Sequence, residues 1–230
     1  MISDGIPLHV GIIMDGNARW ARSRGLQNFD GYRKGVDAAV SVVKAACELG
    51  ISYLTLFLFS TENWSRSSED VNLVFNLFQE TCTSRLEEVC RAGAKIKVIG
   101  DREALNQNVR QVIALLEAET AQNEGIQVYL AMNYGGRAEI LRAVSMMVSE
   151  GVPVAEIDAK KFSAYLYTKD LPDPDLIIRT AGEKRLSNFL LWQSSYSEFY
   201  FCDTLWPDFE KEDFILALDD YRRRDRKYGK

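Results

Sequence analysis

The chain has 230 residues, of which 47% are hydrophobic and 11% aromatic. This composition excludes a disordered chain and predicts one large domain over residues 1–230 with a buried core. The formal net charge of −5 disfavours nucleic-acid binding, because nucleic-acid-binding domains are usually positive. No apolar run approaches the roughly 18 residues of a membrane span, and residues 1–5 do not resemble a signal peptide. We therefore expect a cytoplasmic protein with at most peripheral membrane contact.

Neither the cysteines nor the single histidine has the spacing of a metal site. The four cysteines contain no Cys-x-x-Cys pair, and His9 has no second histidine to join it. We expect free thiols, and we expect His9 to be a hydrogen-bonded strand residue rather than a ligand.

Six short apolar segments have the composition of buried strands. They are His9–Met14, Tyr53–Phe59, Lys95–Ile99, Gln127–Met132, Leu176–Ile178 and Glu198–Phe201. Helical patterns separate most of them, and strands separated by helices cannot pair as hairpins. The sequence predicts a single α/β domain with a six-stranded, mainly parallel sheet flanked by helices.

The helical patterns carry recognisable end signals. Hydrophobic residues repeat at helical spacing before Gly50, which fits a C-terminal cap. A second repeat follows Ser67-x-x-Asp70, which resembles a capping box. Further helical repeats lie around residues 112–116 and 214–221.

Polar segments rich in groups that bind anions follow four of the predicted strands. These are residues 15–20, 60–66, 133–137 and 179–188. Each alone is typical of a solvent-exposed loop, but ligands of open parallel sheets bind at the carboxyl ends of the strands. Together the segments place Arg19, Arg66, Arg179 and Arg185 around one sheet edge of an acidic protein, which indicates an electropositive pocket. Four arginines are enough to bind two diphosphates. Asp15 and Glu198 are candidates for holding a divalent cation there.

Other motifs are missing from these segments. There is no G-x-x-x-x-G-K-[ST] loop, no G-x-G-x-x-G, and no histidine nearby, which disfavours nucleotide hydrolysis and histidine acid–base catalysis. A diphosphate-binding mouth above an apolar sheet suits a substrate with a polar head and an apolar tail.

The chain resembles the cis-prenyltransferases, the undecaprenyl diphosphate synthase family, over nearly its whole length. The resemblance is carried by residues 9–21, 59–64, 133–137, 175–193 and 205–209. It implies a homodimer, with no nucleic-acid partner, that transfers an allylic prenyl group from its diphosphate onto a second prenyl diphosphate with Mg²⁺ as cofactor.

The same resemblance implies roles for individual residues. Asp15 would bind Mg²⁺ with the help of Glu198. The donor diphosphate would be held by the backbone and side chains of Gly16, Asn17, Ala18, Arg19 and Trp20, together with Arg66. The acceptor diphosphate would be held by Arg179, Arg185 and Ser187. Asn17, Ser60 and Asn63 would position the leaving group or relay a proton, and Phe59 and Trp64 would flank the prenyl chains.

Several positions depart from the family pattern. Asn28 stands in place of a donor-site arginine and Tyr32 in place of a histidine, and both remain candidate substrate-binding residues. Lys184 and Lys227 replace a histidine and an arginine near the acceptor site. Leu58 replaces a small residue of the tunnel wall, which predicts a shorter tunnel.

These departures resemble the irregular, lavandulyl-type branch of the family. The preferred hypothesis is therefore a short-chain synthase that joins dimethylallyl diphosphate head to middle. Regular head-to-tail elongation with isopentenyl diphosphate is the first alternative. A non-catalytic partner subunit of a prenyltransferase is the second.

Overall fold

The computed structural model describes residues 5–224, except the side chain of Cys90, and its centre is a six-stranded sheet. The strands are β1 (His9–Ile13), β2 (Tyr53–Ser60), β3 (Lys95–Ile99), β4 (Gln127–Tyr134), β5 (Leu176–Arg179) and β6 (Glu198–Phe201). Their order is β3-β4-β2-β1-β5-β6, and every neighbouring pair is parallel. The predicted fold class and all six predicted strands are confirmed.

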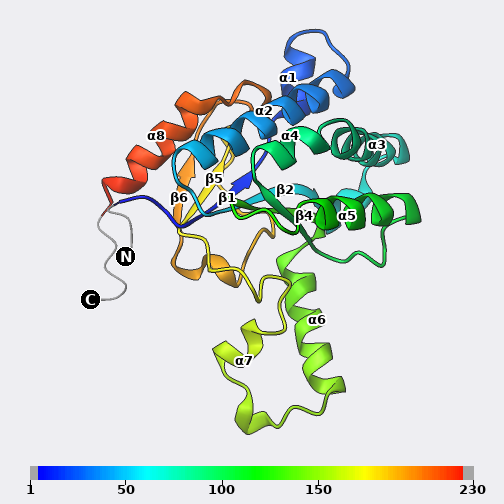
Figure 1. Ribbon diagram of the computed structural model, residues 1–230, viewed down its shortest axis with the longest axis vertical. Helices are drawn as coiled ribbons and strands as arrows, with labels where there is room; N and C mark the ends of the chain where they lie inside the picture. Colours follow the sequence, from blue (N-terminus) through cyan, green and yellow to red (C-terminus); the bar gives the residue numbers. More distant parts are fainter. Residues whose placement is uncertain (1–4, 225–230) are drawn as a thin grey trace.

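Helices alternate with the strands in the described part of the chain (Figure 1). The α-helices are α1 (Asn17–Ser23), α2 (Asn28–Glu48), α3 (Ser68–Ser84), α4 (Leu86–Arg91), α5 (Gln107–Glu119), α6 (Gly136–Ser149), α7 (Ala159–Ser163) and α8 (Lys211–Arg222). Four short 3₁₀ helices, η1 (Thr61–Ser65), η2 (Val154–Glu156), η3 (Gln193–Tyr196) and η4 (Trp206–Asp208), complete the described elements.

The predicted helix ends are present. Gly50 follows α2 with a φ of 79° and donates its N–H to the carbonyl of Cys47, as a left-handed capping residue does. Ser67 is the N-cap of α3, and its side chain accepts a hydrogen bond from the N–H of Asp70. These caps fix where the two long helices begin and end beside the sheet.

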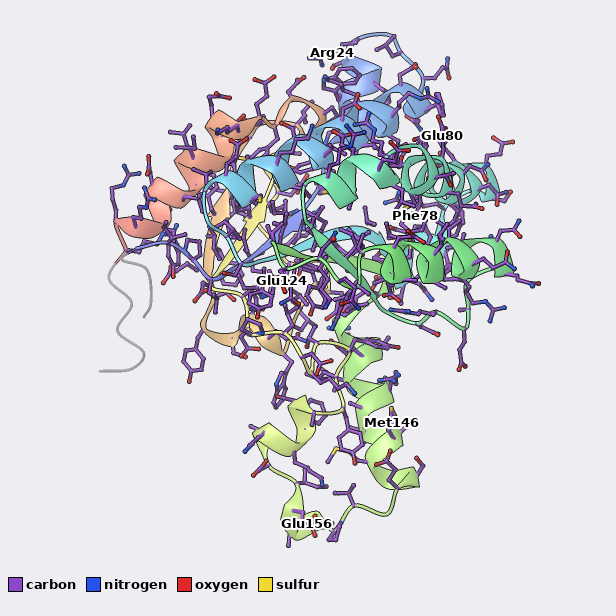
Figure 2. The ribbon with its side chains drawn as sticks, viewed as in Figure 1. Arg24, Phe78, Glu80, Glu124, Met146 and Glu156 are labelled. Carbon is purple, nitrogen blue, oxygen red and sulfur yellow. The ribbon has the colours of Figure 1, made fainter. Side chains whose placement is uncertain are left out.

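The core lies on both faces of the sheet. Residues of α2 and α8 pack with β1, β2 and β5 in the largest hydrophobic cluster, which includes the buried Trp206. Phe189 and Leu190 belong to a separate cluster with β4 and β5. Coverage of both faces explains why the strands are almost continuously apolar. Figure 2 shows how densely the side chains fill this body, from which α6 and α7 extend at one end.

His9 is buried at the start of β1, and its two ring nitrogens contact the Pro172 carbonyl at 2.7 Å and Thr55 Oγ1 at 2.8 Å. The expectation of a hydrogen-bonded strand histidine is confirmed. Burial lowers the pKa of His9 to about 4, against the smaller raising effects of the Pro172 carbonyl and Asp175. No described helix is long and apolar enough to cross a membrane.

Candidate active site

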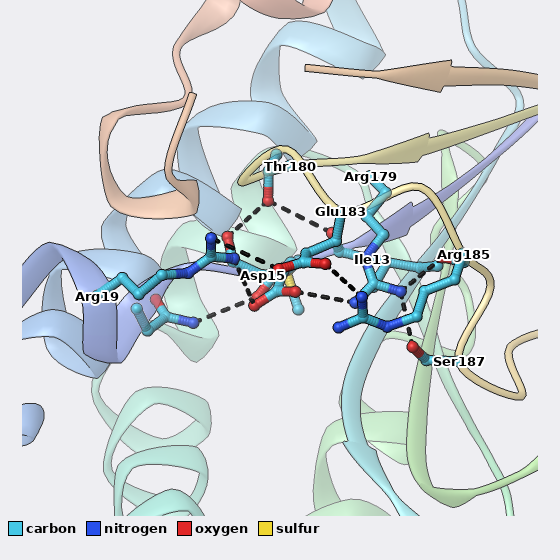
Figure 3. A network of polar contacts seen from close by, with 10 residues as sticks. Ile13, Asp15, Arg19, Arg179, Thr180, Glu183, Arg185 and Ser187 are labelled. Carbon is cyan, nitrogen blue, oxygen red and sulfur yellow. Dashed lines mark hydrogen bonds and ion pairs between the residues drawn. The ribbon is translucent and has the colours of Figure 1, made fainter. Parts of the chain in front are cut away.

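Asp15 is the centre of a polar network at the carboxyl ends of β1 and β5 (Figure 3). Its Oδ2 accepts from Arg179 Nη2 at 2.9 Å, and its Oδ1 lies 3.6 Å from Arg19 Nη2. The hydroxyl of Thr180 donates to the Asp15 carbonyl at 2.7 Å. The adjacency of β1 and β5 thus joins groups that are 164 residues apart in the chain.

Gly16 makes the turn out of β1 possible. Its φ is 114°, in the region that glycine adopts without strain, and it is the N-cap of α1. A Cβ at this position would lie 3.1 Å from both Ala181 Cβ and Leu205 Cα. The glycine therefore lets the β1–α1 turn approach the segment that follows β5.

Arg179 is the most buried arginine of the network, with its side chain 4% exposed. Besides Asp15, it donates to Ser187 Oγ at 2.7 Å and to the Arg185 carbonyl at 2.5 Å. Its guanidinium holds the loop after β5 against the end of β1. A planar donor fork suits this role better than a lysine ammonium would.

Glu183 links the remaining arginines of this network. Its carboxylate lies 3.8 Å from Arg19 Nη1 and forms a close ion pair with Arg185. The sequence placed Glu183 and Thr180 in the segment after β5 but gave neither a role. Their position directly after a strand end that carries Arg179 was the available signal.

Arg66 reaches the site through a different partner. Its Nη1 donates to the hydroxyl of Tyr32 at 3.0 Å, and Tyr32 and Asn17 both line the principal cavity. Asn17 Nδ2 donates to the Met14 carbonyl at 3.3 Å, while its buried Oδ1 has no hydrogen-bond partner among the described residues. Tyr32 and Asn17 therefore connect the polar network with the cavity.

The segment after β2 is fixed by its own hydrogen bonds. Ser60 and Asn63 form a capping box in which the Ser60 N–H donates to Asn63 Oδ1 at 3.0 Å. Trp64 donates from its indole N–H to Asn133 Oδ1 at 2.7 Å. Phe59 is buried and packs 5.2 Å from Trp64 and 4.9 Å from Phe75, measured between ring centroids.

An apolar cavity of about 220 Å³ lies between α2, α3 and the sheet. It begins at Asn17 and Tyr32, passes Leu58, and continues to Leu86 and Val89 of α4. Tyr32 and Lys44 of α2 both line it, and the twelve helical steps from one to the other correspond to roughly 18 Å. At its far end Lys44 forms an ion pair with Glu88.

The structure bears on three of these expectations. Leu58 lies on the cavity wall and the cavity continues beyond it to Leu56, Val128 and Leu130, so the predicted shortening of the tunnel stays a prediction. Phe59 does not line this cavity but faces the cluster formed with α3 and α5. The reason is an irregularity in the β2–β4 register at Leu58, which re-aims the neighbouring side chains.

The expected pairing of Glu198 with Asp15 needs correction. In the sheet Glu198 of β6 pairs with Leu176 of β5, and Leu176 pairs with Val10 of β1. Glu198 therefore lies at the amino ends of the strands. At about 3.3 Å per residue this is roughly 16 Å along β1 from Asp15. Glu198 instead accepts from Arg224 at 2.7 Å. Within one chain the two carboxylates cannot share an ion.

The other predicted residues are less directly connected. Trp20 points its indole N–H to Asp208, 2.6 Å away, and lies under the guanidinium of Arg24. Ala18 belongs to α1, and the half-buried Asn28 is the first residue of α2. The predicted acceptor-site residue Lys227 lies outside the described part of the chain.

Comparisons with known proteins match almost the whole chain. The family model described as "Putative undecaprenyl diphosphate synthase" matches residues 13–229. An isoprenyl transferase of Aquifex aeolicus is 46% identical over 225 residues, which covers 98% of this chain and 96% of the relative. An isoprenyl transferase of Thermotoga maritima is 47% identical over 227 residues, with 97% of each chain covered.

Two solved structures share the fold. Lavandulyl diphosphate synthase from Lavandula x intermedia, in complex with dimethylallyl diphosphate, has a TM-score of 0.95 at 36% identity and covers 99% of this chain and 100% of its own. A probable undecaprenyl diphosphate synthase from Campylobacter jejuni has a TM-score of 0.82, also at 36% identity, and covers 97% and 99%. The two identities are equal, so identity does not favour either reaction.

Proposed function

Because the chain belongs to the undecaprenyl diphosphate synthase family of prenyltransferases, we propose that it extends an allylic prenyl diphosphate with isopentenyl diphosphate and keeps the growing chain in the apolar cavity. The observation that carries this proposal is the continuity of the cavity from Asn17, two residues after Asp15, past Leu58 to α4. A C10 product would need only the first part of that space. A longer chain would use all of it.

The donor diphosphate would lie beside Arg19 and Arg66, against the backbone of residues 16–19. As its C–O bond to the allylic carbon breaks, negative charge accumulates on the departing diphosphate. Arginines already in place stabilise that charge more strongly in the transition state than in the ground state. Asn17, Ser60 and Asn63 would border this position and orient the leaving group.

The acceptor diphosphate would lie beside Arg179, Arg185 and Ser187, which the β5 loop holds together. Glu183 forms ion pairs with Arg19 and Arg185. A bound diphosphate would compete with the Glu183 carboxylate for these two cations. The apolar walls of the cavity exclude water from the allylic cation.

The residues present fit a magnesium ion. Mg²⁺ is commonly bound by one or two carboxylates together with substrate phosphates. The side chain of Asp15 is 31% exposed, and within residues 5–224 its Oδ1 has only the distant contact with Arg19. Asp15 would hold the ion, which when bound neutralises charge on the leaving diphosphate.

An irregular head-to-middle reaction is the second candidate function. It is supported by the TM-score of 0.95 with the lavandulyl synthase and by Tyr32, which accepts the hydrogen bond of Arg66 beside the cavity mouth. Because Tyr32 accepts a hydrogen bond from Arg66, it changes the way in which that arginine can bind a diphosphate. A non-catalytic partner subunit remains the third alternative and predicts no turnover by this chain alone.

Product analysis distinguishes these candidates. Purified protein and Mg²⁺ would be incubated with dimethylallyl diphosphate alone and with added isopentenyl diphosphate, and products identified by mass spectrometry. Linear products of C15 or more in the second mixture are expected. A branched C10 product from dimethylallyl diphosphate alone would establish the irregular reaction instead, and no product in either mixture would contradict both.

A homodimer is part of this proposal. Exposed apolar side chains gather on α6 and the segment after it: Leu141, Val144, Val148, Val154 and Ile157. Figure 1 shows α6 and α7 extending from the body of the molecule. A second copy of this chain would cover these side chains.

A further inference from the structure

Asn188 connects segments that follow three different strands. Its Nδ2 donates to Glu62 Oε1 at 2.6 Å, in the segment after β2. Its side-chain Oδ1 accepts a hydrogen bond from the N–H of Arg137 at 2.8 Å. Its backbone carbonyl accepts one from the N–H of Gly136 at 2.7 Å, and both donors lie at the start of α6. All the polar groups of this side chain are therefore used to hold loops together.

Gly135 shows how closely the three segments approach one another. A Cβ at this position would lie 2.7 Å from Asn188 Nδ2 and still closer to Thr61 Oγ1. Real Cβ atoms do not approach polar atoms that closely, so a larger residue at position 135 would displace the side chain of Thr61 or Asn188. The contact is a built feature of the fold rather than a chance meeting of mobile loops.

The backbone around Asn188 adopts an unusual conformation. Ser187, Asn188 and Leu190 have φ angles of 49°, 67° and 44°. Non-glycine residues rarely adopt positive φ, and asparagine tolerates it better than most. Such backbone persists where surrounding contacts hold it, and it clusters at functional sites.

The two segments that Asn188 joins carry opposite halves of the proposed site. Ser187, its neighbour, accepts from Arg179 on the acceptor side. Glu62 is adjacent to Asn63, within the capping box formed with Ser60 on the donor side. Burial raises the pKa of Glu62, but hydrogen bonds from its own N–H and from Asn188 lower it on balance. The bond is thus charge-assisted.

We infer that Asn188 is a positioning residue that clamps the donor-side segment 60–66 to the acceptor-side segment 185–190 through Glu62. The inference rests on the proposed function, because it assigns those segments to two diphosphates. Fixing the segments together sets the distance between the allylic carbon and the acceptor. Small errors in that distance lower the rate strongly.

Four variants test the clamp. Asn188→Asp places a carboxylate against Glu62, and Asn188→Gly removes the side chain while keeping the positive φ and the net charge. The double variant Asn188→Asp with Glu62→Gln exchanges donor and acceptor and restores both the hydrogen bond and the charge. Asn106→Asp is the matched control, because Asn106 caps α5 through an acceptor oxygen that aspartate retains.

Steady-state kinetics with both substrates give the first readout. Losing a hydrogen bond to a charged group predicts a fall of about tenfold in kcat/KM for Asn188→Asp and Asn188→Gly, with the double variant recovering to within about threefold of wild type. Asn106→Asp is expected to match wild type. Wild-type kinetics in Asn188→Gly, or no recovery in the double variant, would overturn the clamp.

Calorimetric binding of inorganic diphosphate in the presence of Mg²⁺ gives a second readout that needs no turnover. About tenfold weaker binding by Asn188→Gly, with an unchanged melting temperature, supports the clamp. Unchanged affinity contradicts it. Absence of prenyl transfer in the wild type would instead contradict the proposed function and leave this binding comparison to decide the clamp.

Discussion

Asp15 and Arg179 form the pair on which the rest of the site depends. Arg179 is almost fully buried, and its two terminal amino groups donate to Asp15, Ser187 and the Arg185 carbonyl, while its buried Nε has no hydrogen-bond partner among the described residues. A buried cation held in this way is not interchangeable with a lysine, which has one ammonium group and no planar fork. The pair fixes the distance between the segment of residues 15–20, which follows β1, and the segment of residues 179–188 at the end of β5.

Replacing Arg179 tests the importance of that geometry. We expect Arg179→Lys to lower kcat/KM by ~100-fold, because more than one charge-assisted hydrogen bond of about 1.5–3 kcal/mol is lost. The KM for the acceptor should rise more than the KM for the donor. Steady-state kinetics measure both, with Arg110→Lys on the exposed surface of α5 as control. An equal effect in the control would contradict the role.

At the scale of elements, the sequence predicted the strands better than the contacts between them. Mostly apolar composition identified all six strands, and the inner strands β1 and β5 are buried throughout because both faces of the sheet are covered there. The β1–β5 adjacency, which unites Asp15 with Arg179, depends on strand order and has no local signature. The irregularity in the β2–β4 pairing at Leu58 depends on the partner strand, so it could not be predicted from the sequence either.

The position of Glu198 could have been predicted from the sequence, but the prediction made was wrong. It is the first residue of its predicted strand, so a parallel arrangement places it at the edge opposite Asp15. Composition alone suggested a second carboxylate for the metal, but strand direction decides which end a residue occupies. Arg19, Arg179 and Arg185 share one network with Asp15 and Glu183. Their place was predictable because Arg179 ends a strand and the other two lie in segments that follow strands. Their roles in substrate binding stay predictions.

The cavity is also a property of elements, because α2, α3, α4 and three strands line it. We expect Leu130→Trp to fill the cavity beyond Leu58 and shift the products to shorter chains, while the first condensation keeps its rate. Chromatography of the prenyl products measures the distribution. Leu216→Trp on the exposed face of α8 is the control. Unchanged chain lengths in Leu130→Trp would show that products do not occupy this cavity.

At the scale of the whole molecule, stability responds to pH through His9. Its pKa is about 4 in the folded state and 6.5 in the unfolded state, so the unfolded chain binds a proton first as the pH falls. The contribution of neutral, buried His9 to the free energy of unfolding is therefore present above pH 6.5. It is lost as the pH falls from 6.5 to 4. From pH 7 to pH 5 this amounts to about 2 kcal/mol.

Urea unfolding at the two pH values measures that loss. The wild type should lose about 2 kcal/mol more than His9→Gln, in which the group at this position cannot titrate. Comparing differences between the proteins removes the contribution of carboxylates that both share. Identical pH dependence in the two proteins would contradict the assignment to His9.

Assembly is the second property of the whole molecule. We expect Val148→Glu, at a side chain that is 75% exposed on α6, to convert a dimer to a monomer in light scattering. A buried, unpaired charge at an apolar contact is strongly destabilising. Leu216→Glu on α8 is the control and should remain dimeric. A wild-type monomer at all concentrations would contradict the proposed assembly.

Diphosphate should leave the allylic substrate beside Asp15. The test measures the release of inorganic diphosphate from dimethylallyl diphosphate in the presence of isopentenyl diphosphate and Mg²⁺. It compares the wild type with Asp15→Ala. Glu124→Ala is the control, because Glu124 is exposed and lies in the loop before β4. We predict release by the wild type and Glu124→Ala, and a loss of at least about 100-fold in a folded Asp15→Ala, because its metal ligand and its partner for Arg179 are gone. Equal release by Asp15→Ala would contradict the account.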